Sequence, residues 1–218
     1  MVDMKRCVVV LSGGPDSVTA AYWAKEHGYD VHAITFNYGQ KAQIEIERAS
    51  EIASELGAVF KLVDLRNLGE IYRGVTSLVD EKMAVTEEFT DTIIVPFRNG
   101  VFLSVAVAYA DGIGAESIIY GAHASDEPFY PDCRREFYTA FEEAARLGTG
   151  KNIGISSPFS ELPKSVVIKE AVRLGVPLER TWSCYLNGPR HCGVCESCWN
   201  RKKAFIDAAI VDPTEYAV

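Results

Sequence analysis

The chain has 218 residues, 48% of them hydrophobic, and a formal net charge of −8. This length favours one α/β domain with a small appendage. The acidic balance argues against broad binding to a nucleic-acid backbone, although Arg201, Lys202 and Lys203 leave room for a local basic patch. No apolar run reaches the roughly 18 residues of a membrane span, and we expect no cleavable signal before the first strand. These features predict a cytoplasmic protein with neither a membrane nor nucleic acid as a partner.

Strands and helices alternate along the chain. Hydrophobic runs predict strands at 6–11, 31–36, 59–65 and 117–120, with a short strand or extended segment at 92–96. Apolar stripes predict helices at 17–27, 40–56, 99–111, 135–147 and 164–174. Residues 66–92 are polar and irregular, and we interpret them as a mobile excursion. The alternation predicts a parallel sheet with helices on both faces, whose ligands bind at the carboxyl ends of the strands.

The first predicted strand leads into the turn Ser-Gly-Gly-Pro-Asp-Ser at residues 12–17. Gly13 and Gly14 allow the backbone to approach a ligand closely. Pro15 has no N–H group, but near the start of a helix that loss matters little. The free N–H groups of the following helix favour an anion. An ordinary capped turn is the alternative interpretation, but the arrangement after a hydrophobic strand favours phosphate binding.

Three polar side chains in this turn fit a phosphate ligand. Ser12 and Ser17 can donate hydroxyl hydrogen bonds to phosphate oxygens, and Asp16 can hold Mg²⁺ that bridges phosphates. The turn lacks the lysine of the GxxxxGK[ST] loop. It resembles the SGGxDS loop of the ATP pyrophosphatases, which cleave ATP to AMP and pyrophosphate while adenylating a substrate oxygen.

Four cysteines near the C-terminus have the spacing C-x7-C-x2-C-x2-C, and they are Cys184, Cys192, Cys195 and Cys198. Four thiolates with two C-x2-C steps suit tetrahedral Zn²⁺, and a cytoplasmic protein rarely uses disulfides. Because four sulfurs fill the coordination sphere, we predict one structural zinc ion per chain. A redox pair or an iron–sulfur cluster is the competing interpretation, and His191 is interpreted as a neighbour of the site.

A third polar stretch, at 120–137, follows the predicted strand at 117–120 and mixes acids, arginines and aromatics. Asp132 and Arg134 could bind a planar heterocycle that carries amine, carbonyl and carboxylate groups, because arginine pairs with carboxylates in a bidentate manner. A solvated loop is the alternative. Cys133 is interpreted as a packing residue, with a reactive thiol as the alternative.

Five motifs occur in order: SGGPDS, NYGQK at 37–41, VPFRNGVFLS at 95–104, YPDCRREF at 130–137 and the terminal cysteines. Together they resemble the 7-cyano-7-deazaguanine synthase family of queuosine and archaeosine biosynthesis. The resemblance implies an adenine-nucleotide α-hydrolase-like fold, structural zinc and a homodimer. It also implies ATP-dependent conversion of 7-carboxy-7-deazaguanine and ammonia to the nitrile, through adenylated carboxylate and amide intermediates. Many relatives carry glycine at Phe97 and a Ser-Gly pair at Pro128 and Phe129.

The motifs and their predicted positions give three groups of site residues. Catalytic roles are expected for Asp16, Arg98 and Lys164. ATP-binding residues are expected to be Leu11, Ser12, Gly13, Gly14, Asp16, Ser17, Phe36 and Asn99, with Mg²⁺ accompanying the nucleotide. Residues for the deazapurine are expected to be Asp126, Tyr130, Asp132 and Arg134. Lys164 could equally be a solvated surface lysine, and Phe36 a core residue.

We predict an ATP-pyrophosphatase domain at 1–180 and a zinc-binding region at 181–218 that packs on it. Two other functions stay open. One is another SGGxDS enzyme, such as a zinc-containing tRNA thiolase, which would need a basic RNA-binding face. The other is a non-enzymatic zinc interaction module, which would leave the SGGPDS turn without a purpose.

Overall fold

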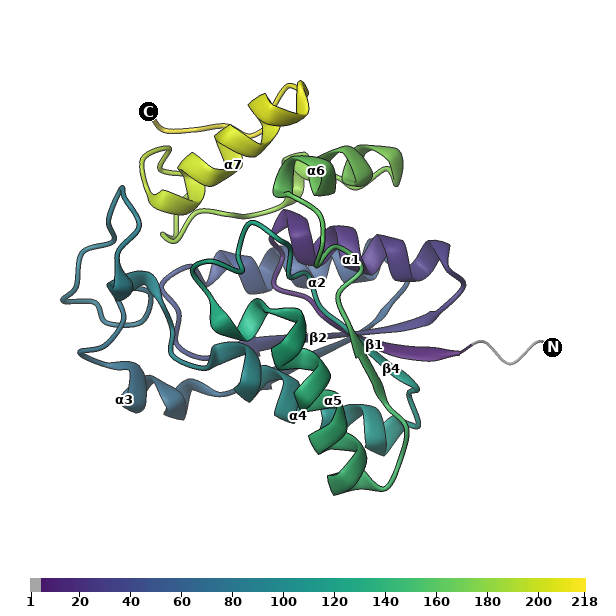
Figure 1. Ribbon diagram of the computed structural model, residues 1–218. Coiled ribbons are helices and arrows are strands. Elements are labelled where there is room, and N and C mark those ends of the chain that lie inside the picture. The colour runs from purple at the N-terminus through teal and green to yellow at the C-terminus, as the bar shows by residue number, and fades with distance from the viewer. Residues whose placement is uncertain (1–4) are drawn as a thin grey trace.

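A five-stranded parallel sheet organises the protein, and the computed structural model describes residues 5–218. The strand order is β3-β2-β1-β4-β5, with β1 in the centre (Figure 1). The strands are β1 (Arg6–Val10), β2 (Asp30–Asn37), β3 (Val59–Asp64), β4 (Ser117–Ile119) and β5 (Gly154–Ser156). In the register of β1, Cys7 lies opposite Val31 on one side and Ser117 on the other. The predicted parallel sheet is confirmed.

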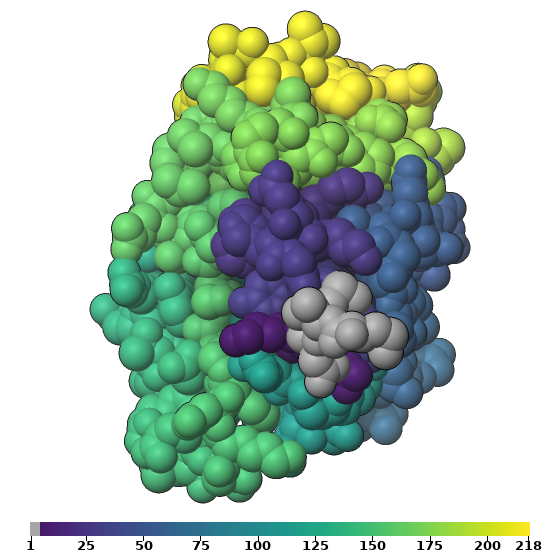
Figure 2. All heavy atoms as spheres, turned by 90° about the vertical axis from the view of Figure 1, so that its right-hand side faces the viewer, coloured from purple at the N-terminus to yellow at the C-terminus, as the bar shows by residue number. Residues whose placement is uncertain are grey.

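Helices cover both faces of this sheet, as predicted. The face above it in Figure 1 carries α1 (Pro15–Glu26), α2 (Ile44–Leu56), α6 (Lys164–Arg173) and α7 (Glu196–Ala208). The other face carries α4 (Arg98–Ile113) and α5 (Arg135–Thr149). Figure 2 shows the same layers from the side, with yellow C-terminal residues above the purple residues of β1 and α1, and teal residues below.

Alternate residues of β1 supply the two hydrophobic cores. Cys7 and Val9 are buried with α1, α6 and α7, whereas Val8 is buried with α4 and α5. Successive side chains of a strand point to opposite faces of the sheet, and a parallel strand covered on both faces is apolar on both. The continuous apolar run of β1 follows from this double burial.

Several elements differ from the expectations. No strand forms at 92–96; instead a 3₁₀ turn at Asp91–Ile93 leads into α4. The short strand β5 and the helix α7 were not expected from the sequence. The strand has only three residues, and the helix begins within the segment that carries the clustered cysteines. Residues 66–92 are irregular, as predicted, but they contain α3 (Gly69–Tyr72) and pack through Tyr72 and Leu78 against Tyr38 and Val95.

One segment, Asp91–Ile113, is long and apolar enough to cross a membrane, with a mean hydropathy of 1.6. Core helices of other proteins share this length and composition. Here Leu103, Ala106 and Ala110 of α4 are buried against the sheet. This packing accounts for the apolar character of the segment.

The C-terminal helix α7 packs directly on the upper layer. Ala204, Phe205 and Ala208 belong to the same core cluster as α1 and α6, so the proposed division at residue 180 stays a prediction. Arg201 is completely buried and donates hydrogen bonds to the Leu178 carbonyl and to the side chains of Thr181 and Ser183. Arg201 therefore cannot contribute to the surface basic patch that its sequence neighbours suggest.

Candidate active site

A cavity of about 260 Å³ lies at the carboxyl ends of β1, β2 and β4. This is the edge of a parallel sheet where ligands bind. The predicted site residues that line it are Leu11, Ser12, Gly14, Asp16, Ser17, Phe36, Arg98, Asn99, Asp126, Tyr130, Asp132 and Lys164. Gly13 and Arg134 do not line the cavity. The structure thus brings together most of the selected side chains, which come from distant parts of the sequence.

The SGGPDS turn approaches its neighbours very closely at two glycines. Gly13 has a φ of +83°, and a Cβ there would lie 2.6 Å from the Glu45 carbonyl oxygen. Gly121, at the end of β4, would place a Cβ 2.7 Å from the backbone of Asp16 and Ser17. A side chain at either position would push the turn away from the sheet edge. Gly13 acts by shaping this turn, and Gly121 was not expected from the sequence.

The turn leaves the start of α1 open to a ligand. Gly14 is the N-cap residue, and no side chain of the described residues caps the helix. The Ser17 hydroxyl donates to the Gly14 carbonyl at 3.1 Å and accepts from the Ser12 N–H at 3.1 Å, which fixes the turn. Uncapped N–H groups at a helix start attract an anion. The turn therefore has the geometry that a phosphate requires.

Asp16 and Lys164 form an ion pair across the cavity. Lys164 Nζ donates to Asp16 Oδ2 at 2.8 Å, although the two residues are 148 positions apart in the chain. Burial alone would raise the pKa of Asp16, but Lys164 and His123 hold it well below its usual range. Burial lowers the pKa of Lys164, but the neighbouring Asp16 raises it, and the net shift of the pKa is upward. Asp16 is therefore ionised, and Lys164 is charged in the first turn of α6, where Asp16 offsets the unfavourable helix dipole.

A buried histidine completes this cluster. His123 Nε2 lies 3.6 Å from Asp16 Oδ2 and 3.4 Å from Asp126 Oδ2, and neither ring nitrogen has a hydrogen-bond partner within the described part of the chain. Asp16 Oδ1 is also buried without a partner there. Unpaired buried polar atoms are costly unless a ligand satisfies them. A carboxylate oxygen of this kind is a suitable Mg²⁺ ligand, so the donor at Asp16 fits a metal–nucleotide complex.

The start of α4 forms the opposite wall. Arg98 donates to the Tyr38 hydroxyl at 3.3 Å, and the rings of Phe36 and Phe102 stack with centroids 4.2 Å apart. Asp132 Oδ2 accepts from the Asn99 N–H at 3.0 Å. Asp132 thus holds a helix start in addition to facing the cavity. The cation and the aromatic pair offer a surface for a planar ring.

Glu45 adds a carboxyl group to this wall that was not expected from the sequence. Burial raises its pKa to about 8, although Arg98 opposes the shift. Nothing in the sequence separates it from the other acids of α2. His123 carries a weak signal, because it is a polar residue directly after a strand. Tyr38 lies within the NYGQK motif but was not selected.

Arg134 lies outside the cavity, whereas Cys133 is a buried part of its wall. Arg134 Nε donates to the Glu127 carbonyl at 3.0 Å, and its role in binding the substrate stays a prediction. Cys133 is buried and accepts from the Asn99 side chain at 3.3 Å. Burial raises the pKa of the Cys133 thiol, which favours packing over nucleophilic chemistry.

The four cysteines of the C-terminal region come together as predicted. The sulfur atoms of Cys184, Cys192, Cys195 and Cys198 all lie within 4.8 Å of one another. The Cys192–Cys198 and Cys184–Cys195 sulfur pairs are 3.9 Å and 4.0 Å apart. Zinc–sulfur bonds of about 2.3 Å in a tetrahedron require sulfurs about 3.8 Å apart. The cluster could hold a metal ion, and its geometry fits zinc.

Comparison with known proteins agrees with this site. The family model described as "Queuosine biosynthesis protein QueC" matches residues 6–209. The chain belongs to this family. The 7-cyano-7-deazaguanine synthase of Thermoplasma acidophilum is 42% identical over 224 residues, covering 99% of this chain and 93% of that protein. That of Methanoculleus marisnigri is 42% identical over 222 residues, covering 98% and 99%. The resemblance drawn from the QueC-family motifs is confirmed.

A solved structure supports the fold class. NMN synthetase from Francisella tularensis superimposes with a TM-score of 0.53 and 17% identity, covering 95% of this chain and 78% of that chain. At this identity the likeness bears on the fold alone. It confirms the adenine-nucleotide α-hydrolase-like architecture that was expected for a QueC-family chain.

Proposed function

We propose that this chain is an AMP-forming carbon–nitrogen ligase that converts 7-carboxy-7-deazaguanine and ammonia to 7-cyano-7-deazaguanine. The observation that carries the proposal is the Asp16–Lys164 pair beside the uncapped start of α1, with Asp16 Oδ1 left without a partner among the described residues. This arrangement suits a metal-bound triphosphate. The name of the relatives supplies the product, 7-cyano-7-deazaguanine, and the family resemblance supplies the acceptor.

The chemistry proceeds by adenylation. A carboxylate is a poor electrophile, so its oxygen first attacks the α-phosphate of ATP and releases pyrophosphate. Ammonia then displaces AMP to give the amide. A second ATP activates the amide oxygen in the same way, and loss of AMP and protons leaves the nitrile.

The residues divide this work among themselves. Lys164 and the N–H groups of the SGGPDS turn stabilise the negative charge that develops on the phosphates. Mg²⁺, held by Asp16 when bound, supplies further neutralisation of phosphate charge. Phe36 and Arg98 offer a surface for the adenine, and Asp126, Tyr130, Asp132 and Arg134 stay our proposed residues for the deazapurine.

The cysteine cluster is proposed to hold one structural Zn²⁺. Four thiolates leave no open position for water or substrate. A homodimer remains a prediction from the resemblance. A cytoplasmic location and the absence of a nucleic-acid partner remain predictions from the sequence and its acidic charge balance. A tRNA thiolase is disfavoured because its reactive thiol would have to be Cys133, whose pKa is raised by burial, and because Arg201 is buried.

Product analysis tests the proposal. The protein is incubated with ATP, ammonium and 7-carboxy-7-deazaguanine, and the products are separated by chromatography and identified by mass spectrometry. We expect AMP, pyrophosphate and the nitrile, with no AMP when the heterocycle is omitted. Formation of ADP and orthophosphate as the primary products would contradict the proposal.

A further inference from the structure

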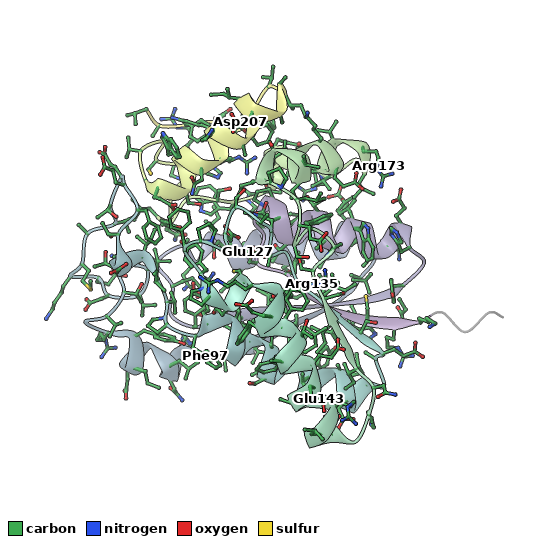
Figure 3. All side chains as sticks on the ribbon, in the orientation of Figure 1. Phe97, Glu127, Arg135, Glu143, Arg173 and Asp207 are labelled. Carbon is green, nitrogen blue, oxygen red and sulfur yellow. The ribbon has the colours of Figure 1, made fainter. Side chains whose placement is uncertain are left out.

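A second chamber of about 850 Å³ adjoins the active-site cavity. Five residues line both spaces, namely Asp126, Tyr130, Lys164, Glu196 and Asn200. The chamber lies between the loop that follows β4 and the helix α7. Figure 3 labels Glu127 on that loop and Asp207 on α7. Because the two spaces share Lys164, a molecule in the chamber can extend toward the SGGPDS turn.

The volumes of the two spaces indicate which of them can hold a whole small-molecule substrate. Small-molecule sites usually measure roughly 300 to 1,000 Å³. The inner cavity, at about 260 Å³, falls below that range, and the outer chamber, at about 850 Å³, lies within it. The inner cavity is too small for a nucleotide and a bicyclic acceptor together. A two-substrate reaction at the phosphate turn therefore needs the adjoining space.

Aromatic side chains form the walls of the outer chamber. The rings of Phe89 and Phe129 pack with centroids 4.6 Å apart, and Phe89 meets Tyr130 edge-on at 6.1 Å. Trp199 lines the chamber from α7. Phe129 and Trp199 are 47% and 57% exposed, which is unusual for large aromatic residues. Exposed rings of this kind suit stacking with a planar heterocycle.

Charges in the chamber match both ends of such a molecule. Glu87 and Glu88 lie along the part of its lining that the inner cavity does not share, whereas Asp207 in that part is paired with Lys203 at 2.7 Å. Carboxylates accept hydrogen bonds from ring N–H and amino groups. Lys164, at the junction, is a cation that suits the carboxylate of the acceptor.

We propose that the outer chamber binds the acceptor heterocycle, with its ring against Phe129 and Trp199 and its carboxylate directed toward Lys164. The inference rests on the proposed function, because the acceptor is the substrate assigned there. It keeps Asp126 and Tyr130 as acceptor residues and replaces Asp132 and Arg134, which do not line the chamber. Trp199 directly follows Cys198, a member of the cysteine cluster. The four-cysteine region therefore forms one wall of the acceptor site.

Phe129 adds a second aromatic ring to the acceptor site. Pro128 precedes Phe129 in the loop that follows β4. The Phe129 N–H donates to the Asp126 carbonyl at 3.0 Å, so a turn fixes the ring beside the junction. Phe129 is thus expected to strengthen acceptor binding without touching the nucleotide.

Steady-state kinetics of Trp199→Ala and Phe129→Ala test the chamber, with Ile206→Ala as the matched control. Ile206 lies on the same helix as Trp199, is 76% exposed, and lines neither space. Loss of one stacking contact should raise KM for the acceptor about fivefold or more, while KM for ATP changes less than about twofold. The Ile206→Ala variant should match wild type for both substrates.

Separate binding titrations distinguish failure of the chamber from failure of the function. Acceptor binding to wild type should quench tryptophan fluorescence, and Trp199→Phe should lose this quenching. An unchanged acceptor KM in both alanine variants of an active enzyme would overturn the chamber and leave the function standing. The chamber would be overturned in the same way if Trp199→Ala changed only the oligomeric state. If wild type bound no acceptor at all, the proposed function would itself be wrong.

Discussion

At the scale of single residues, our proposal assigns the chemistry to the pairing of Asp16 with Lys164. Each is an unfavourable charge on its own, since Asp16 is buried and Lys164 sits at the positive end of α6. Together they compensate each other at 2.8 Å. A triphosphate and its cation would find the opposite charges already in position, so little reorganisation is needed.

Asp16→Asn should lower the turnover number on the order of 100-fold or more, because the variant loses both a metal ligand and the partner of Lys164. AMP release under saturating substrates measures the effect. Asp111→Asn is the matched control, since Asp111 pairs with Lys151 far from the cavity, and it should keep wild-type turnover. If the Asp16→Asn variant turned over as fast as wild type, the SGGPDS turn would have no role in the mechanism.

A separate prediction concerns Glu45 and the pH dependence of the free energy of unfolding. Burial raises its pKa to about 8 in the folded protein, against the ordinary value of 4.5. Between these values the unfolded chain has released the proton and the folded chain retains it, so the contribution of Glu45 to stability falls as pH rises through this window. Above about 8 the contribution is flat.

Glu45→Gln removes this titration, and denaturant unfolding across the window measures it. The stability of wild type should decrease relative to the variant as pH rises from 4.5 to about 8. Glu47→Gln is the control on the same helix, and its difference from wild type should not follow that pattern. If the free energies of unfolding of wild type and Glu45→Gln differed by the same amount at every pH in this window, Glu45 would be ionised throughout it.

At the scale of elements, the start of α4 stores backbone strain. Phe97 is the N-cap residue of α4 and has a φ of +53°, in the left-handed region that favours glycine. Its side chain projects at the surface (Figure 3), and its ring packs edge-on against Phe137 at 5.7 Å. The ring contacts offset a backbone conformation that favours glycine.

Phe97→Gly should therefore be more stable than Phe97→Ala by about 1 kcal/mol, because both lose the ring and only alanine keeps the strain. Urea unfolding of the two variants gives the difference directly. If alanine and glycine were equally stable, the left-handed backbone at Phe97 would not persist in solution.

The C-terminal region is the second element with its own prediction. Cys195→Ser should lose about one equivalent of bound metal and should lower the melting temperature, since the cluster ties α7 to the segment before it. Cys133→Ser is the control, because Cys133 is a buried cysteine outside the cluster. Metal analysis and thermal unfolding check both. Retention of a full equivalent of metal by Cys195→Ser would contradict the four-cysteine site.

The limits of sequence reasoning are also visible at this scale. The strands β1 to β3 and the long helices were predicted because their apolar patterns are continuous or periodic. The segment at 92–96 has a similar run of β-branched residues, but it begins with a 3₁₀ turn at Asp91–Ile93, and the Thr92 carbonyl accepts hydrogen bonds from Ser77 rather than from a strand of the sheet. The three-residue β5 has too short a pattern to stand out, and the charges of α7 obscure its packing face.

On the scale of the whole molecule, the structure brings together most of the side chains that were selected from sequence motifs. The phosphate turn and the cysteines are local patterns, so their side chains converge as expected. Tertiary structure decides the rest. His123 and Glu45 gain importance from burial, and Arg201 loses its place at the surface for the same reason. None of these environments can be read from neighbouring residues in the chain.

An isotope experiment tests the central claim, carboxylate adenylation at the SGGPDS turn, most directly. The acceptor is prepared with ¹⁸O in its carboxylate and incubated with ATP and ammonium, and the AMP is examined by mass spectrometry. Attack of the carboxylate and then of the amide oxygen on the α-phosphate transfers one labelled oxygen to each AMP. We expect singly labelled AMP, unlabelled pyrophosphate and a nitrile without oxygen at that carbon. Unlabelled AMP, or label in orthophosphate released together with ADP, would contradict adenylation of the acceptor.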